Sequence, residues 1–121
     1  MCLAVSYVAK QHIAIEDVPI YKVLVKHILG GFHGPFQRQF RWSKNCMHCS
    51  ILDKPDRTHF HSSKYVIERG LHAFLNLEDA KNYRARPKEF VAKMVIPKGT
   101  PYYIGINNRQ VAAARIFWPE D

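Results

Sequence analysis

Two cysteines and two histidines in the middle of the chain have the residue types of a metal site. Cys46 and Cys49 form a C-x-x-C pair, and His59 and His61 follow ten residues later. Zinc is bound tetrahedrally by thiolates and imidazoles, and a close cysteine pair followed by two histidines supplies both ligand types. The sequence therefore predicts a zinc-stabilised module built on these four side chains.

The spacing of this cluster leaves a second interpretation open. His59-x-His61 is tighter than the usual spacing of zinc-binding histidines, so the four residues are also compatible with reduced thiols and surface imidazoles. A redox role is disfavoured, since no βαβ pattern surrounds the C-x-x-C pair. Three cysteines are an odd number and too few for a secreted disulfide framework, which predicts a cytoplasmic protein.

A basic and aromatic segment precedes the cysteines. Aromatic rings can stack on nucleic-acid bases while cationic side chains contact phosphates, which makes this segment a candidate binding surface. Alternatively, its aromatic residues are the buried face of a strand. The candidate binding residues are Arg38, Phe40, Arg41, Trp42 and Lys44.

The net charge of +8 on 121 residues favours polyanionic partners, either a nucleic acid or an acidic protein. This charge is spread evenly, because residues 1–60 and residues 61–121 each carry a net +4. The composition, 47% hydrophobic and 23% charged, is that of a folded domain and excludes a low-complexity chain. No apolar stretch is long enough to span a bilayer, so we expect no membrane partner.

Alternation of apolar and polar residues predicts a small mixed or antiparallel sheet with one or two short helices, an α+β fold in one domain spanning 1–121. An irregular insertion is expected at about 32–63. Asn76 is a plausible helix N-cap, and Pro87 ends that helix. The predicted strands cover residues 2–7, 20–26, 36–42, 64–69, 70–75, 89–96, 102–106 and 111–118.

Three blocks of the chain carry a resemblance to known proteins. They are Tyr21-Lys22-Val23-Leu24, Gly70 to Tyr83, and Ile96 to Gly105. The chain resembles a group of small uncharacterised bacterial and phage proteins that share these blocks. It is more remotely similar to ADP-ribosyltransferases of the poly-ADP-ribose polymerase type, whose second motif is a glycine-led strand followed by a helix bearing Ala-Asn-Tyr.

The second resemblance implies an NAD-binding cleft. Tyr83 would stack on nicotinamide with Tyr21 nearby, Lys22 would stand where the family has a ribose-contacting histidine, and His72 would replace a strand tyrosine. Glu120 is the one late acid that could imitate the catalytic glutamate. These departures imply weak or absent transferase activity, so whether the chain is an enzyme stays open. The alternative is that the same block is ordinary core, with His72 a hydrogen-bonded structural residue.

The sequence alone thus favours a small basic cytoplasmic protein that binds an acidic protein or a nucleic acid. A diverged ADP-ribosyltransferase-like NAD-binding domain and a zinc-stabilised interaction module are the alternatives. Four of the seven histidines lie between His33 and His61, so a specialised surface is expected there.

Overall fold

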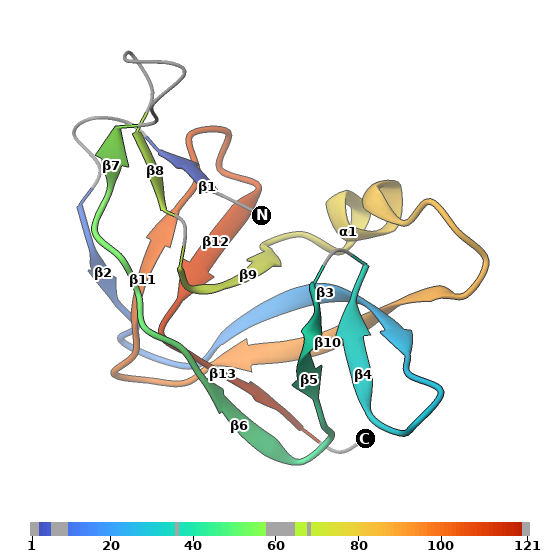
Figure 1. Ribbon diagram of the computed structural model, residues 1–121. Helices are drawn as coiled ribbons and strands as arrows, with labels where there is room; N and C mark the ends of the chain where they lie inside the picture. The colour runs from blue at the N-terminus through green and yellow to red at the C-terminus, as the bar shows by residue number, and fades with distance from the viewer. Residues whose placement is uncertain (1–2, 6–9, 36, 58–64, 68, 120–121) are drawn as a thin grey trace.

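The fold is dominated by antiparallel β-structure. The computed structural model describes residues 3–5, 10–35, 37–57, 65–67 and 69–119 (Figure 1). These residues form one helix, α1 (Leu77–Tyr83), and thirteen strands. The strands are β1 (Leu3–Val5), β2 (His12–Ile13), β3 (Val18–Lys26), β4 (Phe32–Gly34), β5 (Gln37–Trp42), β6 (Cys46–Cys49), β7 (Asp56–Arg57), β8 (Tyr65–Ile67), β9 (Leu71–Phe74), β10 (Glu89–Ile96), β11 (Pro101–Ile104), β12 (Gln110–Ala113) and β13 (Arg115–Trp118).

The predicted α+β class, including an ADP-ribosyltransferase-like fold, is wrong: this is a small β-rich domain with one short helix. All strand pairs among the described residues are antiparallel. The physical reason is that one seven-residue helix cannot form a layer, so strands must cover most of the core. No helix in the described ranges is long and apolar enough to cross a membrane.

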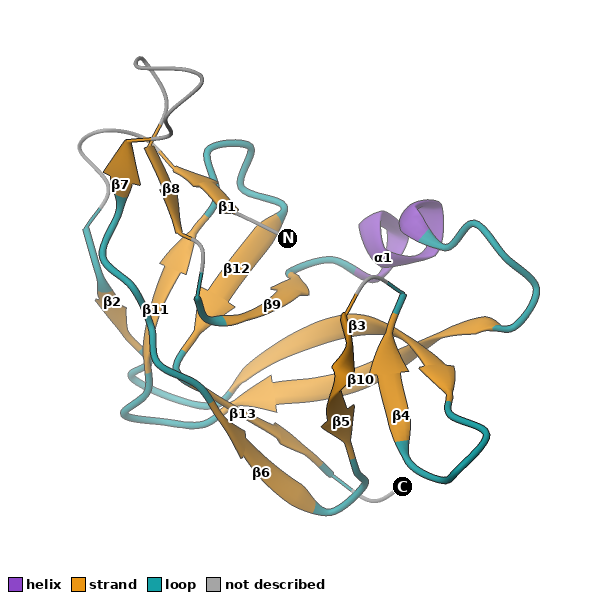
Figure 2. Cartoon of the chain, in the orientation of Figure 1, coloured by secondary structure: helices purple, strands orange, loops and turns teal. Residues whose placement is uncertain are grey.

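Ten strands form one sheet, and three form a second (Figure 2). The larger sheet has the order β2-β11-β12-β9-β3-β10-β13-β6, with the β4–β5 hairpin branching from β3. The smaller sheet has the order β1-β8-β7. Strand β3 is therefore the branch point of the larger sheet.

Strand β3 separates two environments because its side chains alternate between faces. Ile20 and Leu24 are fully buried on the core face, where they belong to the same cluster as Met94. Tyr21, Val23 and Val25 point to the opposite face. Along one edge β3 pairs with all of β10, whereas its other edge is shared by β9 and β4.

Helix α1 covers part of the face opposite the core. It contacts β3, β9 and β10, and in Figure 2 it stands above these strands. Its buried Ala80 lies against the sheet, while Glu78 and Asp79 occupy the first turn, where the helix dipole favours acids. The helix ends after Tyr83, and the chain returns through residues 84–88 to the start of β10.

The predicted irregular region at 32–63 contains four strands among its described residues, β4 to β7. β4 and β5 form a hairpin beside β3, whereas β6 pairs with β13 and β7 pairs with β8. The single strand expected at 111–118 is divided at Ala114, since β12 pairs with β9 and β11 whereas β13 pairs with β6 and β10. Ala114 donates its backbone N–H to Pro101 O at this bend.

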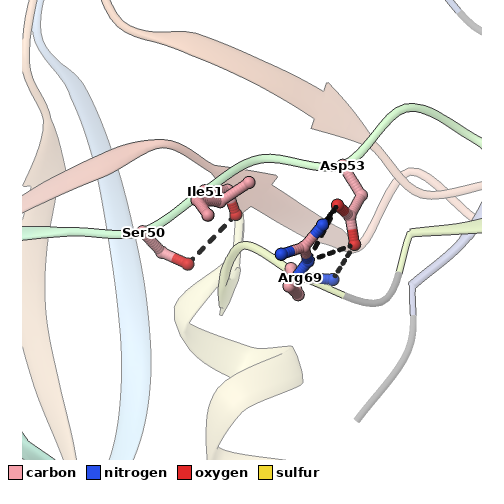
Figure 3. A network of polar contacts seen from close by, with 4 residues as sticks. All are labelled: Ser50, Ile51, Asp53 and Arg69. Carbon is pink, nitrogen blue, oxygen red and sulfur yellow. Dashed lines mark hydrogen bonds and ion pairs between the residues drawn. The ribbon is translucent and has the colours of Figure 1, made fainter.

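An ion pair joins the segments that lead into and out of the smaller sheet (Figure 3). Asp53, between β6 and β7, accepts hydrogen bonds from the Arg69 backbone N–H and guanidinium at 2.9 to 3.1 Å. The Asp53 N–H in turn donates to Arg69 O at 3.0 Å. Nearby, the Ser50 hydroxyl donates to Ile51 O. The aspartate thereby fixes the spacing of two connections that are distant in sequence.

Candidate functional site

A pocket of about 580 Å³ opens at the end of β3, beside the connection from α1 to β10. Its walls come from three segments: the end of β3 with its following turn, the start of the β4–β5 hairpin, and the chain before β10. The lining residues are Val25, Lys26, His27, Ile28, His33, Pro35, Arg86, Pro87, Lys88 and Glu89. Imidazoles, a carboxylate and cations thus surround an apolar surface.

Strand register places a histidine and a glutamate on the two sides of this pocket. Val25 is directly opposite Glu89 on β10 and directly opposite His33 on β4. Residues opposite one another in antiparallel strands point to the same face, so all three side chains share it. His33 and Glu89 therefore flank Val25, with their backbones about 10 Å apart across two strand spacings.

His33 is held by its own backbone. Its Nδ1 lies 2.7 Å from Gly34 O, and since a carbonyl can only accept, Nδ1 is the donor. The imidazole is 8% exposed, and the His27 ring meets it edge to face at 5.5 Å between centroids. This tautomer leaves Nε2 for the pocket.

Glu89 is a buried carboxylate at the other side. It is 4% exposed, and its Oε1 accepts a hydrogen bond from the Ala85 N–H at 3.0 Å. Burial raises the pKa of the Tyr83 hydroxyl, and the negative charge of Glu89 raises it further. The Ala85 N–H, in the turn after helix α1, therefore positions the carboxylate through Oε1 and leaves Oε2 for a ligand.

Three cations are among the residues that line the pocket. Lys26, Arg86 and Lys88 are exposed. Ion pairs within the described part of the chain lie elsewhere, between Arg69 and Asp53, Lys81 and Glu78, and Arg109 and Asp79. Three cations against one carboxylate give the pocket a net positive charge at neutral pH.

Lys22, the candidate ribose contact, lies on the other face of β3. Its Nζ donates to His72 O at 2.7 Å and stands 5.6 Å from the centre of the Trp42 ring. The side chain retains partial exposure, but the ammonium is desolvated, and this burial lowers the lysine pKa to about 8. Lys22 is therefore a tethered interior cation, separate from the pocket.

His72 contributes its backbone carbonyl to that tether, while its ring is buried at 5% exposure. Burial lowers the His72 pKa to about 4, and the charge of Lys22 contributes to the lowering. The carbonyls of Ile67 and Gly70 oppose this shift, although neither ring nitrogen has a well-formed hydrogen bond in the described residues. The imidazole is consequently neutral at physiological pH.

The two tyrosines of the predicted NAD cleft are both related to Phe74, Tyr21 by strand register and Tyr83 by ring contact. Tyr21 is opposite Phe74 in the strand register, and the Phe74 and Tyr83 rings are 5.1 Å apart. Lys22 points away from this group, and Glu120 lies outside the described residues. NAD binding through Tyr21 and Tyr83 stays a prediction.

The two cysteines lie at the ends of a strand. Cys46 and Cys49 are exposed on β6, and residues three apart on a strand point to opposite faces. His59 and His61 lie outside the described residues, and the described ones contain no group of three or more metal ligands. The zinc hypothesis also stays a prediction.

The basic and aromatic segment is split between core and surface. Trp42 is 1% exposed and Phe40 packs against the same core, so neither ring forms an open stacking platform. Arg41 and Lys44 are exposed, and Lys44 Nζ stands 6.0 Å from the centre of the Trp118 ring. Arg38 lies in β5, with its side chain outside the described set.

The pocket residues His33, Glu89, Lys26, Arg86 and Lys88 were not among the sequence candidates. One signal was present: basic residues alternate before a lone acid at the start of the strand predicted at 89–96, in Arg84-Ala-Arg86-Pro-Lys88-Glu89. Their convergence with His33 depends on strand pairing across more than fifty residues. No protein-family profile, curated protein or solved structure matches this chain.

Proposed function

We propose that the protein binds single-stranded nucleic acid, with one nucleotide seated in the pocket at the end of β3. The observation that carries this proposal is the combination of three cations at the mouth with an apolar, ring-lined interior. Nucleotides have the matching division into an anionic phosphate and a flat, largely apolar base. A cytoplasmic location, as the cysteine count predicts, is compatible with an RNA partner.

The cations supply the phosphate contacts. Lys26 comes from the end of β3, whereas Arg86 and Lys88 come from the connection before β10. Together they approach a ligand from two sides of the opening. Arginine can bind a phosphate in a bidentate manner, and lysine acts as a mobile point charge beside it.

The interior supplies contacts for a base. Pro35 and Pro87 present apolar surface, the His27 ring adds a flat polarisable face, and Ile28 adds an apolar side chain at the mouth. A base can enter such a concave site only when it is unstacked, which favours single strands over duplexes. An acidic peptide offers charge without a flat ring, so it would leave this interior unfilled.

Equilibrium binding tests the proposal. Fluorescence anisotropy of a labelled single-stranded 12-mer is measured against salt for the wild type and for the triple variant Lys26→Gln, Arg86→Gln, Lys88→Gln. Each single-strand phosphate contact contributes about −0.7 to the slope of log K against log salt, so the variant should lose about 2 from that slope. Its affinity at low salt should fall correspondingly.

A second triple variant controls for net charge. Lys54→Gln, Lys98→Gln and Arg115→Gln remove the same charge from exposed sites away from the pocket lining. An equal loss in both triple variants would overturn the proposal, because only total charge would then matter. Pocket-dependent binding of polyglutamate without binding of the 12-mer would identify an acidic protein as the partner.

A further inference from the structure

We propose that the pocket cleaves RNA by transphosphorylation, with Glu89 as general base and His33 as general acid. This inference rests on the proposed nucleic-acid binding and assigns a reaction to the same site. The observation behind it is that two buried groups able to exchange protons project from the same face of the sheet on either side of Val25, and both line the cationic pocket. If His33 and Glu89 only stabilised the sheet, neither side chain would need to line a cavity.

The separation of the two groups suits an in-line displacement. Their strands are about 10 Å apart at the backbone, and both side chains extend from the same face. One phosphodiester group can therefore lie between them, with the attacking oxygen toward one side chain and the leaving oxygen toward the other. General acid–base catalysis requires this placement on both sides of the reacting atom.

The hydrogen bonds leave the required atoms for catalysis. Glu89 uses Oε1 to accept from the Ala85 N–H, which leaves Oε2 for a substrate hydroxyl. His33 uses Nδ1 to donate to Gly34 O, which leaves Nε2 for the leaving oxygen. Each side chain is thus oriented by a backbone group through one atom and meets the ligand with the other.

The reaction balances without a cofactor or water. The Glu89 carboxylate takes the proton of a ribose 2′-hydroxyl, and the 2′-oxygen forms a bond to phosphorus. The bond from phosphorus to the 5′-oxygen breaks, and the His33 imidazolium gives its Nε2 proton to that oxygen. The products are a 2′,3′-cyclic phosphate and a 5′-hydroxyl, while Lys26, Arg86 and Lys88 offset the charge that accumulates on the phosphate oxygens.

The test uses a fluorescent DNA 12-mer that contains one ribonucleotide. The full-length protein should cut this oligonucleotide only at the ribonucleotide, and mass spectrometry should identify the cyclic phosphate. An all-DNA 12-mer should bind and stay intact, because it has no 2′-hydroxyl.

Two conservative variants separate catalysis from folding and binding. Glu89→Gln keeps an oxygen that accepts from the Ala85 N–H, and His33→Asn keeps a donor near Gly34 O. Each should lower the cleavage rate about 100-fold or more, with oligonucleotide affinity within a few-fold of wild type. His12→Asn, which changes an exposed histidine stacked on Tyr102, should cut normally and so controls for a contaminating nuclease.

The outcomes distinguish this inference from the binding proposal. Pocket-dependent binding without any cleavage would overturn the catalytic assignment and leave the binding proposal standing. Cleavage that persists in both conservative variants, or that cuts the all-DNA strand equally, would also overturn it. Absence of oligonucleotide binding would overturn both.

Discussion

Lys22 and Val25 are three residues apart on strand β3 and lie on opposite faces of it. On the Lys22 face, an ammonium is tethered to His72 O and desolvated against Trp42. On the Val25 face, His33 and Glu89 flank an open pocket with cations at its mouth. One strand therefore holds titratable groups in two settings: an ammonium and an imidazole packed in the interior on one face, and an imidazole and a carboxylate that line a pocket on the other.

The two faces should differ most in what they contribute to stability. Leu24→Ala removes a fully buried side chain from the core and should lower the free energy of unfolding by about 2–5 kcal/mol. Val25→Ala, at the half-buried floor of the pocket, should cost no more than about 1 kcal/mol. Urea denaturation measures both. Equal losses would show that the pocket floor is as tightly packed as the core.

Acid should destabilise the Lys22 face through His72. The pKa of this imidazole falls from an ordinary 6.5 to about 4 on folding, so the unfolded chain binds the proton more readily. Its contribution is complete above pH 6.5 and is lost as the pH falls from 6.5 through 4, by about 3 kcal/mol in total. His72→Phe should remove this part of the pH dependence. The measurement is the free energy of unfolding of variant and wild type between pH 4 and pH 7, and the difference between the two should change with pH. An unchanged difference across that range would contradict the assignment.

The tethered lysine should be a net cost at neutral pH. Folding lowers its pKa from 10.5 to about 8, so its ammonium is disfavoured in the folded state below pH 8. Lys22→Met should therefore raise the free energy of unfolding at pH 7 by about 1 kcal/mol, even though it removes the hydrogen bond to His72 O.

The advantage of this variant should shrink with rising pH. Wild-type stability gains between about pH 8 and pH 10.5, because there the unfolded chain still binds the proton that the folded chain has lost. Thermal unfolding at pH 7, 9 and 10 provides the comparison. A variant less stable than wild type at all three values would mean that the tether outweighs the desolvation.

The smallest expected effect distinguishes the mouth of the pocket from ordinary surface. Ile28 and Leu29 are adjacent and almost fully exposed, at 95% and 87%. Of these two residues, Ile28 lines the pocket and Leu29 does not. Ile28→Ser should weaken 12-mer binding about threefold through lost apolar contact. Leu29→Ser should leave it unchanged, and neither should alter stability. Equal weakening by both would place the nucleotide on the tip of the turn and outside the pocket.

Local patterning determined much of this protein from the sequence alone. Alternation predicted β3, β9 and β10 close to their observed bounds, and Asn76 with Glu78 and Asp79 located the start of helix α1. These features depend on neighbours within a few residues, which a sequence displays directly. Fold class was misjudged because helix and strand patterns do not reveal how strands pair, and a single short helix weighs little against thirteen strands.

Tertiary structure alone decided which titratable side chains come together. Lys22 and His72 were candidates through a family resemblance, and the Cys46–Cys49 pair through its residue types. The fold desolvates the Lys22 ammonium, buries the His72 ring and directs the cysteines to opposite faces of β6. His33 and Glu89 are fifty-six positions apart and become neighbours only because both pair opposite Val25. The net charge of +8 was evident from composition, but which basic residues line the pocket depends on long-range pairing, whose register no local pattern encodes.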